Sequence, residues 1–152
     1  MATFEEPCVG ESVESVTKEF SDKFNVKFVL KEEKNVAITD LLRRKDVLAV
    51  LPTGYGKSLI YQYFVVAKAK QNMWYPNMCA SALVICPLTG IIDDQIMEAA
   101  NLGITAGRLT DFLKEETLKP RQLMFASAEE VTSPAFQGLL KDSSVLNFVL
   151  NC

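Results

Sequence analysis

The stretch Leu-Pro-Thr-Gly-Tyr-Gly-Lys-Ser, residues 51–58, joins two apolar segments of different period. Before it, residues 47–51 form a short run of branched apolar side chains that ends at Pro52, which is typical of a buried strand entering a turn. After it, residues 57–70 place apolar side chains on one broad face of a helix. A strand, a glycine-rich loop and a helix in this order predict an α/β fold whose loop offers its backbone to a ligand.

The residue types in this loop suit a triphosphate. Gly54 and Gly56 allow backbone conformations that a side chain would obstruct, so that N–H groups converge on phosphate oxygens at the positive end of the next helix. Lys57 can reach the β- and γ-phosphates, and the Ser58 hydroxyl can ligate Mg²⁺. A chance glycine-rich turn is the weaker interpretation, because strand, loop, Gly-Lys-Ser and apolar helix occur in this order. We therefore predict that ATP and Mg²⁺ are bound by Pro52, Thr53, Gly54, Tyr55, Gly56, Lys57 and Ser58, with Ser58 as the metal ligand.

The rest of the chain alternates between helical and strand-like periodicity. Expected helices cover residues 32–44, 57–70 and 90–101, a further one begins at Asp111, and helical pieces extend to Leu140. Expected strands cover residues 47–51, 82–86, 105–108 and 122–126, and a last apolar run occupies 145–150. Gly103 stands where a helix C-cap glycine is expected. Strands that alternate with helices imply a parallel α/β sheet.

Two regions are expected along the chain. Residues 1–19 are polar and acidic with little periodicity, so we expect a tail rather than part of the core. Residues 20–152 then form one partial domain. The final apolar run is followed by Asn151 and Cys152 without a turn or a polar tail, so we expect a chain that is cut within a larger domain.

Composition excludes several classes of protein. Among 152 residues there is no histidine, which removes Ser-His-Asp and Cys-His hydrolases and His-dependent acid–base schemes. The four cysteines form no C-x-x-C pair, so a zinc site or a disulfide framework is not expected and a reducing compartment is the simpler interpretation. The net charge of −3 gives no global attraction to phosphate backbones. Because no apolar run approaches the roughly 18 residues of a membrane span, we expect an intracellular protein without a membrane partner.

Three segments of the sequence resemble motifs of a known family. Residues 51–62 are similar to motif I of RecQ-like superfamily 2 helicases, and residues 87–95 are similar to motif Ia, which lies along the nucleic-acid strand. Residues 125–130 resemble more weakly the family's Ser/Ala-Pro-Glu segment, with Ala128 in place of proline. The resemblance spans residues 24–152. It implies a three-layer RecA-like P-loop NTPase fold of mostly parallel strands, ATP and Mg²⁺ as cofactors, and a 3′-to-5′ DNA helicase motor.

The resemblance also implies a partner and its contacts. DNA, single-stranded or at a duplex junction, is the expected partner, and nucleic-acid contacts are expected from Pro87, Leu88, Thr89 and Gln95. In eukaryotes the family's work on DNA implies the nucleus, otherwise the cytoplasm. The oligomeric state stays open.

The chain departs from the family at two places that matter. Lys34 stands near the position of the glutamine that reads adenine, which puts adenine selectivity in doubt. No acidic motif II follows residues 146–150, so we expect the fold to be truncated before it and assign no catalytic residue. Nucleotide binding without turnover, and no autonomous unwinding, are the consequences expected for the chain alone.

Of two alternatives to a helicase motor, one stays open and the other is disfavoured. A non-catalytic module from a truncated isoform or gene fragment, which holds nucleotide or a partner, stays open. A GTPase or small-molecule kinase is disfavoured because Asn-Lys-x-Asp and Asp-x-x-Gly are absent.

Other polar and aromatic residues are given structural roles. Asp93 and Asp94 are adjacent on a helix and point in different directions, so they do not predict a metal pair. Trp74 and Tyr75 are expected to pack a loop, and Cys79 and Cys86 to act as small apolar residues. Scattered cations are interpreted as a solvated surface rather than a phosphate-binding face: Lys68, Lys70, Arg108, Lys114, Lys119 and Arg121.

Overall fold

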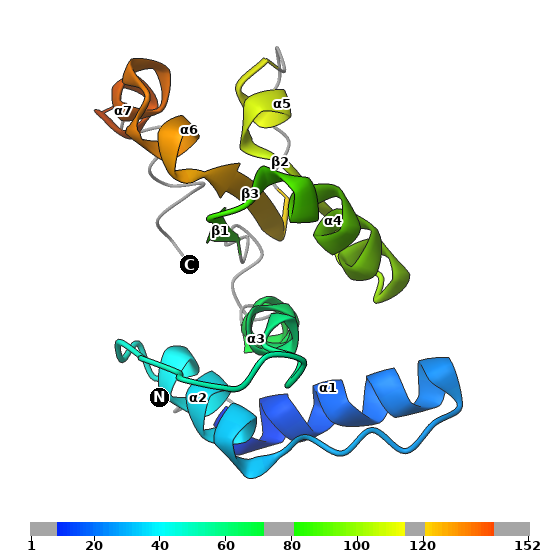
Figure 1. Ribbon diagram of the computed structural model, residues 1–152. Coiled ribbons are helices and arrows are strands. Elements are labelled where there is room, and N and C mark those ends of the chain that lie inside the picture. The colour runs from blue at the N-terminus through cyan, green and yellow to red at the C-terminus, as the bar shows by residue number, and fades with distance from the viewer. Residues whose placement is uncertain (1–8, 72–80, 115–120, 142–152) are drawn as a thin grey trace, which may run out of the picture. The chain divides into compact units, whose positions relative to one another are not determined.

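The computed structural model describes residues 9–71, 81–114 and 121–141 (Figure 1). The chain divides into two compact units, Met1–Tyr75 and Pro76–Cys152. Within the described part of the chain, none of the helices combines the length and apolar character that crossing a bilayer requires.

The described residues of the first unit form a packed set of three helices. They are α1 (Val9–Phe24), α2 (Glu32–Leu42) and α3 (Ser58–Gln71), and each contacts the other two. The rings of Phe20 and Tyr63 meet edge to face with centroids 5.1 Å apart, and Lys70 Nζ lies 2.7 Å from Glu19 Oε2. The buried apolar side chains of this unit include Val13, Val16, Phe20, Ala37, Ile38, Leu42, Tyr63, Val65 and Ala67.

Helix α1 differs from the polar tail expected over residues 1–19. Val13, Val16 and Phe20 repeat at helical spacing and are buried, while the acidic residues between them face solvent. The segment was expected to be a tail because its composition is acidic, but three of its apolar residues form a narrow buried stripe along the helix. The boundary of the domain at residue 20 remains a prediction, and residues 1–8 lie outside the described part.

The run at residues 47–51 was expected to be a strand, and this prediction is wrong for the structure. The segment is irregular, with Leu48 93% exposed and Val50 86% exposed. A strand needs a hydrogen-bonding neighbour, and the described residues of the first unit form helices and irregular segments only. The apolar pattern therefore identified a segment whose side chains suit a sheet. It did not identify a neighbouring strand with which this segment could form hydrogen bonds.

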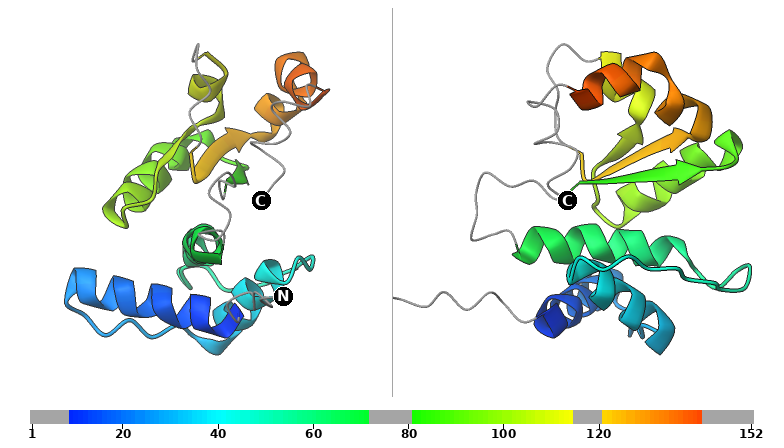
Figure 2. Two further views of the ribbon diagram at one scale, coloured as in Figure 1. Left: turned by 180° about the vertical axis from the view of Figure 1, so that it is seen from behind. Right: turned by 90° about the vertical axis from the view of Figure 1, so that its left-hand side faces the viewer.

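In the part that the structure describes, the second unit is an α/β unit around three parallel strands. These are β1 (Ala82–Cys86), β2 (Ala106–Arg108) and β3 (Leu123–Ser127), in the spatial order β1-β3-β2, as Figure 2 shows. The helical elements are η2 (Thr89–Ile91), α4 (Ile92–Asn101), α5 (Leu109–Lys114), α6 (Ala128–Thr132) and α7 (Pro134–Lys141). The predicted parallel α/β architecture is confirmed.

Strand β3 is the centre of this unit, because it pairs with both other strands and its first four residues are buried. Successive side chains of a strand point to opposite faces. On one face Met124 and Ala126 pack in a cluster with Leu109 and Phe112 of α5 and with Phe136 of α7. Helix α4 packs against β2 and β3.

Helix α4 ends as the glycine at position 103 predicts. Gly103 has φ +76°, and its N–H donates to Ala100 O at 2.9 Å. The N–H of Ile104 donates to Ala99 O at 3.0 Å. This pair of bonds is the Schellman arrangement, which satisfies the last helix carbonyls and turns the chain toward β2.

Candidate nucleotide-binding site

The loop at residues 52–58 has the backbone that its glycines predict. Gly54 and Gly56 have φ of +79° and +70°, in the left-handed region that other residues avoid. The N–H of Tyr55 donates to Pro52 O at 3.3 Å, which closes a tight turn over residues 52–55 that contains Gly54.

Helix α3 starts directly after the loop and supplies a positive end. It begins at Ser58, and its first turn carries no acidic residue that would cancel the helix dipole. The Lys57 side chain is exposed, and among the residues that the structure describes it makes no hydrogen bond or ion pair. Lysine and hydroxyl therefore stand at the site where an anion would be held.

Two lysines from the region of α2 surround the Tyr55 ring. Lys31 Nζ lies 3.8 Å from the ring centroid and Lys34 Nζ 5.3 Å from it, both within the range of a cation–π contact. A Cβ atom at position 56 would lie 3.1 Å from Lys34 Nζ. The sequence pattern marked Lys34 only as a departure from a glutamine, and its contact with the loop depends on the packing of α2 against α3.

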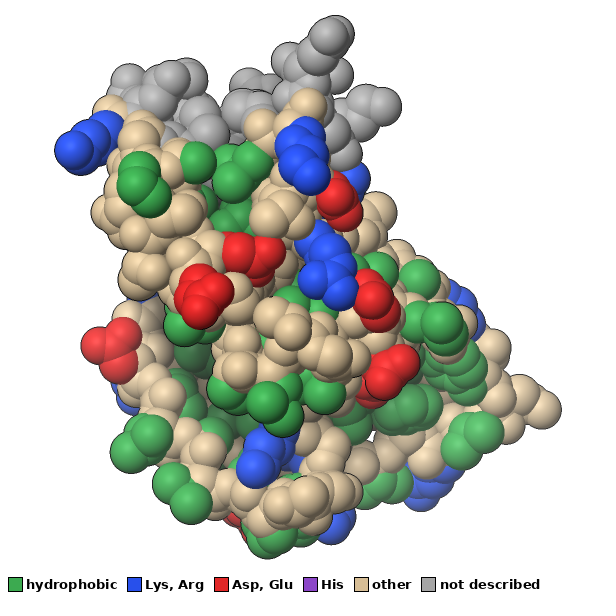
Figure 3. Space-filling model, turned by 45° about the horizontal axis from the view of Figure 1, so that its top comes forward, with side chains coloured by type: hydrophobic (Ala, Val, Ile, Leu, Met, Phe, Trp, Pro, Cys, Tyr) green, Lys and Arg blue, Asp and Glu red, His purple; other side chains and the backbone are tan. Residues whose placement is uncertain are grey.

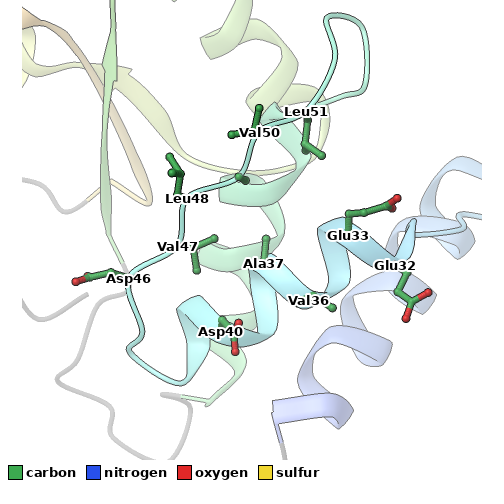
Figure 4. Close-up of a pocket in the computed structure, with 11 residues that line it drawn as sticks. Glu32, Glu33, Val36, Ala37, Asp40, Asp46, Val47, Leu48, Val50 and Leu51 are labelled. Carbon is green, nitrogen blue, oxygen red and sulfur yellow. The ribbon is translucent and has the colours of Figure 1, made fainter.

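A separate hollow lies beside the loop and does not suit phosphate. It has a volume of about 580 Å³ and is bounded by α2 and the irregular segment before the loop (Figure 4). Its carboxylates come from Glu32, Glu33, Asp40 and Asp46. These acidic groups would repel an anion, so the hollow does not suit a phosphate group.

The motif Ia segment leaves the carboxyl end of strand β1. Cys86, the last residue of β1, lies opposite Ser127, the last residue of β3, in a parallel register. Residues 87–89 and 128–130 therefore start from neighbouring strands at one edge of the sheet. Pro87, Leu88 and Thr89 are exposed, whereas Gln95 is half-buried on α4.

The weaker match at residues 125–130 contains a helix cap. Ser127 Oγ accepts a hydrogen bond from the N–H of Glu130 at 3.2 Å, and Glu130 Oε2 accepts one from the N–H of Ser127 at 2.6 Å. This reciprocal pair satisfies two backbone donors at the start of α6. Ser127 and Glu130 thus have a structural role.

The described polar residues of the second unit include an ion pair but no metal cluster. Arg108 Nε and Nη2 donate to Asp93 Oδ1 at 3.1 Å and 2.9 Å. Throughout the described ranges, no group of three or more His, Cys, Asp or Glu side chains could hold a metal ion. Burial raises the pKa of the Cys86 thiol, which disfavours the thiolate that nucleophilic chemistry needs. On the face shown in Figure 3, cationic and anionic side chains are interspersed rather than gathered by sign.

A glycine loop before a helix, and a small parallel α/β sheet with loops at its carboxyl edge, are features of nucleotide-dependent enzymes of the P-loop class. The sequence profile of the DEAD/DEAH box helicase family matches residues 32–133, which is more than half of the chain. The chain belongs to the DEAD/DEAH box helicase family.

Within this family, the chain is similar to ATP-dependent DNA helicases of the Q type. The chain is 39% identical over 80 residues to the ATP-dependent DNA helicase Q1 of Rattus norvegicus, a match that covers 51% of this chain and 11% of that protein. It is 33% identical over 99 residues to the ATP-dependent DNA helicase Q-like 2 of Arabidopsis thaliana, covering 64% of this chain and 13% of that protein. The predicted resemblance to RecQ-like helicases is confirmed, and the chain spans only a small part of the length of these relatives.

Proposed function

We propose that the loop at residues 52–58 binds the triphosphate of ATP together with Mg²⁺, as the nucleotide site of a RecQ-like, 3′-to-5′ DNA helicase motor. The observation that carries this proposal is the pair of left-handed glycines directly before helix α3. Family membership and the names of the relatives, which are ATP-dependent DNA helicases, support ATP as the nucleotide.

Mg²⁺ fits the residues at this loop. Mg²⁺ prefers oxygen ligands, keeps several waters and is bound with the substrate phosphates rather than in an all-protein cage. Ser58 opens α3 and would supply one hydroxyl ligand, with phosphate oxygens and waters supplying the others. Lys57 would neutralise charge on the β- and γ-phosphates.

The DNA contact is proposed for the carboxyl edge of the sheet in the second unit. Pro87, Leu88 and Thr89 follow the last residue of β1 at this edge and are exposed to solvent, and Leu88 is 65% exposed. They are therefore accessible to a DNA strand. Gln95 on α4 is the fourth proposed contact. A role on DNA implies a nuclear location in a eukaryotic cell.

The test of nucleotide binding is a titration of the chain with a fluorescent ATP analogue and Mg²⁺. We expect Lys57→Ala to raise the dissociation constant by roughly tenfold or more, because a charge-assisted contact to phosphate contributes about 1.5–3 kcal/mol. Lys18→Ala is the matched control, since Lys18 is an exposed lysine on α1. Equal binding by the wild type and Lys57→Ala would contradict the proposal that this loop binds the triphosphate.

The same samples test whether this chain turns nucleotide over. Lys57-dependent binding without hydrolysis is the result expected for this chain alone, because no acidic motif II follows residues 146–150. Hydrolysis stimulated by single-stranded DNA would contradict that expectation and would favour an active motor over a module that only holds nucleotide. DNA binding itself is measured by fluorescence anisotropy of a labelled oligonucleotide, and an unchanged affinity in Thr89→Ala and Leu88→Ala variants would remove these residues from the proposed contact.

A further inference from the structure

We propose that Lys34 is a second phosphate-binding cation of the loop, so that this chain binds nucleoside triphosphates mainly through their phosphates and selects weakly among bases. The inference rests on the proposed nucleotide site and specifies its substrate class.

Lys34 is an unusual residue in this structure because it is a buried charge. It is 7% exposed and is the only charged side chain among the buried residues that the structure describes. Moving an ammonium out of water is costly unless it is paired. In the described ranges no carboxylate lies within ion-pair distance of Lys34, although Glu32 and Glu33 precede it on the same helix.

The ammonium of Lys34 lies against the loop that would hold phosphate. Its Nζ would be 3.1 Å from a Cβ atom at position 56, so it lies directly beside the backbone of Gly56, and the absence of a side chain there allows this close approach. The Tyr55 ring, 5.3 Å away, offers only a weak cation–π contact. A bound polyanion would therefore supply the counter-charge that the protein does not supply.

The chemistry of an ammonium favours phosphate over base. A lysine side chain has three donors and no acceptor. On the edge that carries N7, adenine presents a donor next to an acceptor and guanine presents two acceptors, so an ammonium cannot select adenine over guanine by complementarity there. Phosphate oxygens are acceptors only and carry the opposite charge, and they are common to all nucleoside triphosphates.

Lys31 provides a control within the same cluster. Its Nζ lies 3.8 Å from the Tyr55 centroid, but the residue is exposed and is not among the atoms that a Cβ at position 56 would meet. A lysine that is solvated and stacked on tyrosine has its charge screened by water. Its removal should affect phosphate binding less than removal of Lys34.

The experiment is competition against a fluorescent ATP analogue in Mg²⁺ buffer. The competitors are ATP, GTP, CTP and inorganic tripolyphosphate, and the proteins are the wild type, Lys34→Met, Lys34→Gln, Lys34→Arg, Lys31→Met and Lys57→Ala. We expect ATP and GTP to compete within about threefold of each other in the wild type. Lys34→Met and Lys34→Gln should weaken all four competitors, tripolyphosphate included, by a similar factor of roughly ten or more. Lys34→Arg and Lys31→Met should stay close to the wild type.

The outcomes separate this inference from the nucleotide site itself. If Lys57→Ala weakens binding while both neutral Lys34 variants leave tripolyphosphate competition unchanged, the role of Lys34 is wrong and the site stands. If the wild type prefers ATP to GTP by more than tenfold, the weak base selection is wrong. If Lys57→Ala binds like the wild type, the proposed site fails instead. Urea-unfolding midpoints measured on the same proteins identify any variant whose loss of binding comes from unfolding. Two neutral variants, Lys34→Met and Lys34→Gln, are used so that the test still stands if one of them does not fold.

Discussion

At the scale of single residues, two glycines with the same backbone conformation have different surroundings. Gly54 and Gly56 both have positive φ, but a Cβ at position 54 would meet nothing within 4 Å, whereas one at position 56 would meet Lys34 Nζ. A side chain in the left-handed region costs about 1–2 kcal/mol wherever it stands. The two positions therefore separate backbone strain from displacement of a cation.

We predict that Gly54→Ala and Gly56→Ala lower the free energy of unfolding by a similar amount, about 1–2 kcal/mol each. Gly56→Ala should weaken binding of a fluorescent ATP analogue more, because its methyl group would press on the Lys34 ammonium and shift it. Repeating Gly56→Ala in a Lys34→Met background tests the cause: the excess loss should shrink there, as coupled residues are not additive. An excess loss that persists without Lys34 would mean that the methyl group blocks the ligand directly.

The sequence was sufficient for part of this site and not for the rest. The φ angles of Gly54 and Gly56 and the start of a helix at Ser58 followed from the pattern Gly-Tyr-Gly-Lys-Ser, because glycine adopts positive φ without the steric cost that a side chain brings. The position of Lys34 did not follow, since it belongs to another helix and reaches the loop through the packing of α2 on α3. The roles of Pro87, Leu88, Thr89 and Gln95 stay predictions.

At the scale of elements, helix α1 shows how composition can hide an amphipathic stripe. Its solvent face is acidic and polar, but Val13, Val16 and Phe20 are buried, and Phe20 is 1% exposed against Tyr63 of α3. We predict that Phe20→Ala lowers the free energy of unfolding by about 3–5 kcal/mol, as for other buried aromatic truncations. Urea unfolding followed by far-UV circular dichroism measures this, with Lys18→Ala on the exposed face as control. A loss below about 1 kcal/mol would return α1 to the polar tail that its composition suggested.

Two apolar runs of similar composition have different structures for a physical reason. Residues 123–126 of β3 are buried, and residues 123–125 pair with a strand on both sides, whereas residues 47–51 form no strand. Backbone hydrogen bonds to a neighbour make a strand, and periodicity reports only that side chains suit burial. Sequence reasoning therefore found the three observed strands and also expected one that the structure lacks. The apolar run at 145–150 lies outside the described residues.

At the scale of the whole molecule, charge and exposed apolar surface act in opposite directions. A net charge of −3 on 152 residues gives modest repulsion between copies. Leu48 and Val50 are separated by one residue on a segment that pairs with no strand among the residues that the structure describes, and both are almost fully exposed. Exposed apolar segments with free backbone groups tend to pair with other chains.

We predict concentration-dependent self-association of this chain in sedimentation velocity, and its reduction by the double substitution of Leu48 and Val50 to lysine. Two charges on this segment oppose pairing between copies, and they should cost little folding free energy because both side chains are exposed. Val29→Lys is the matched control, since Val29 is 73% exposed on the segment between α1 and α2. If the double variant instead unfolds at markedly lower urea while Val29→Lys does not, then residues 47–51 are buried in solution, and the strand expected from their sequence forms after all.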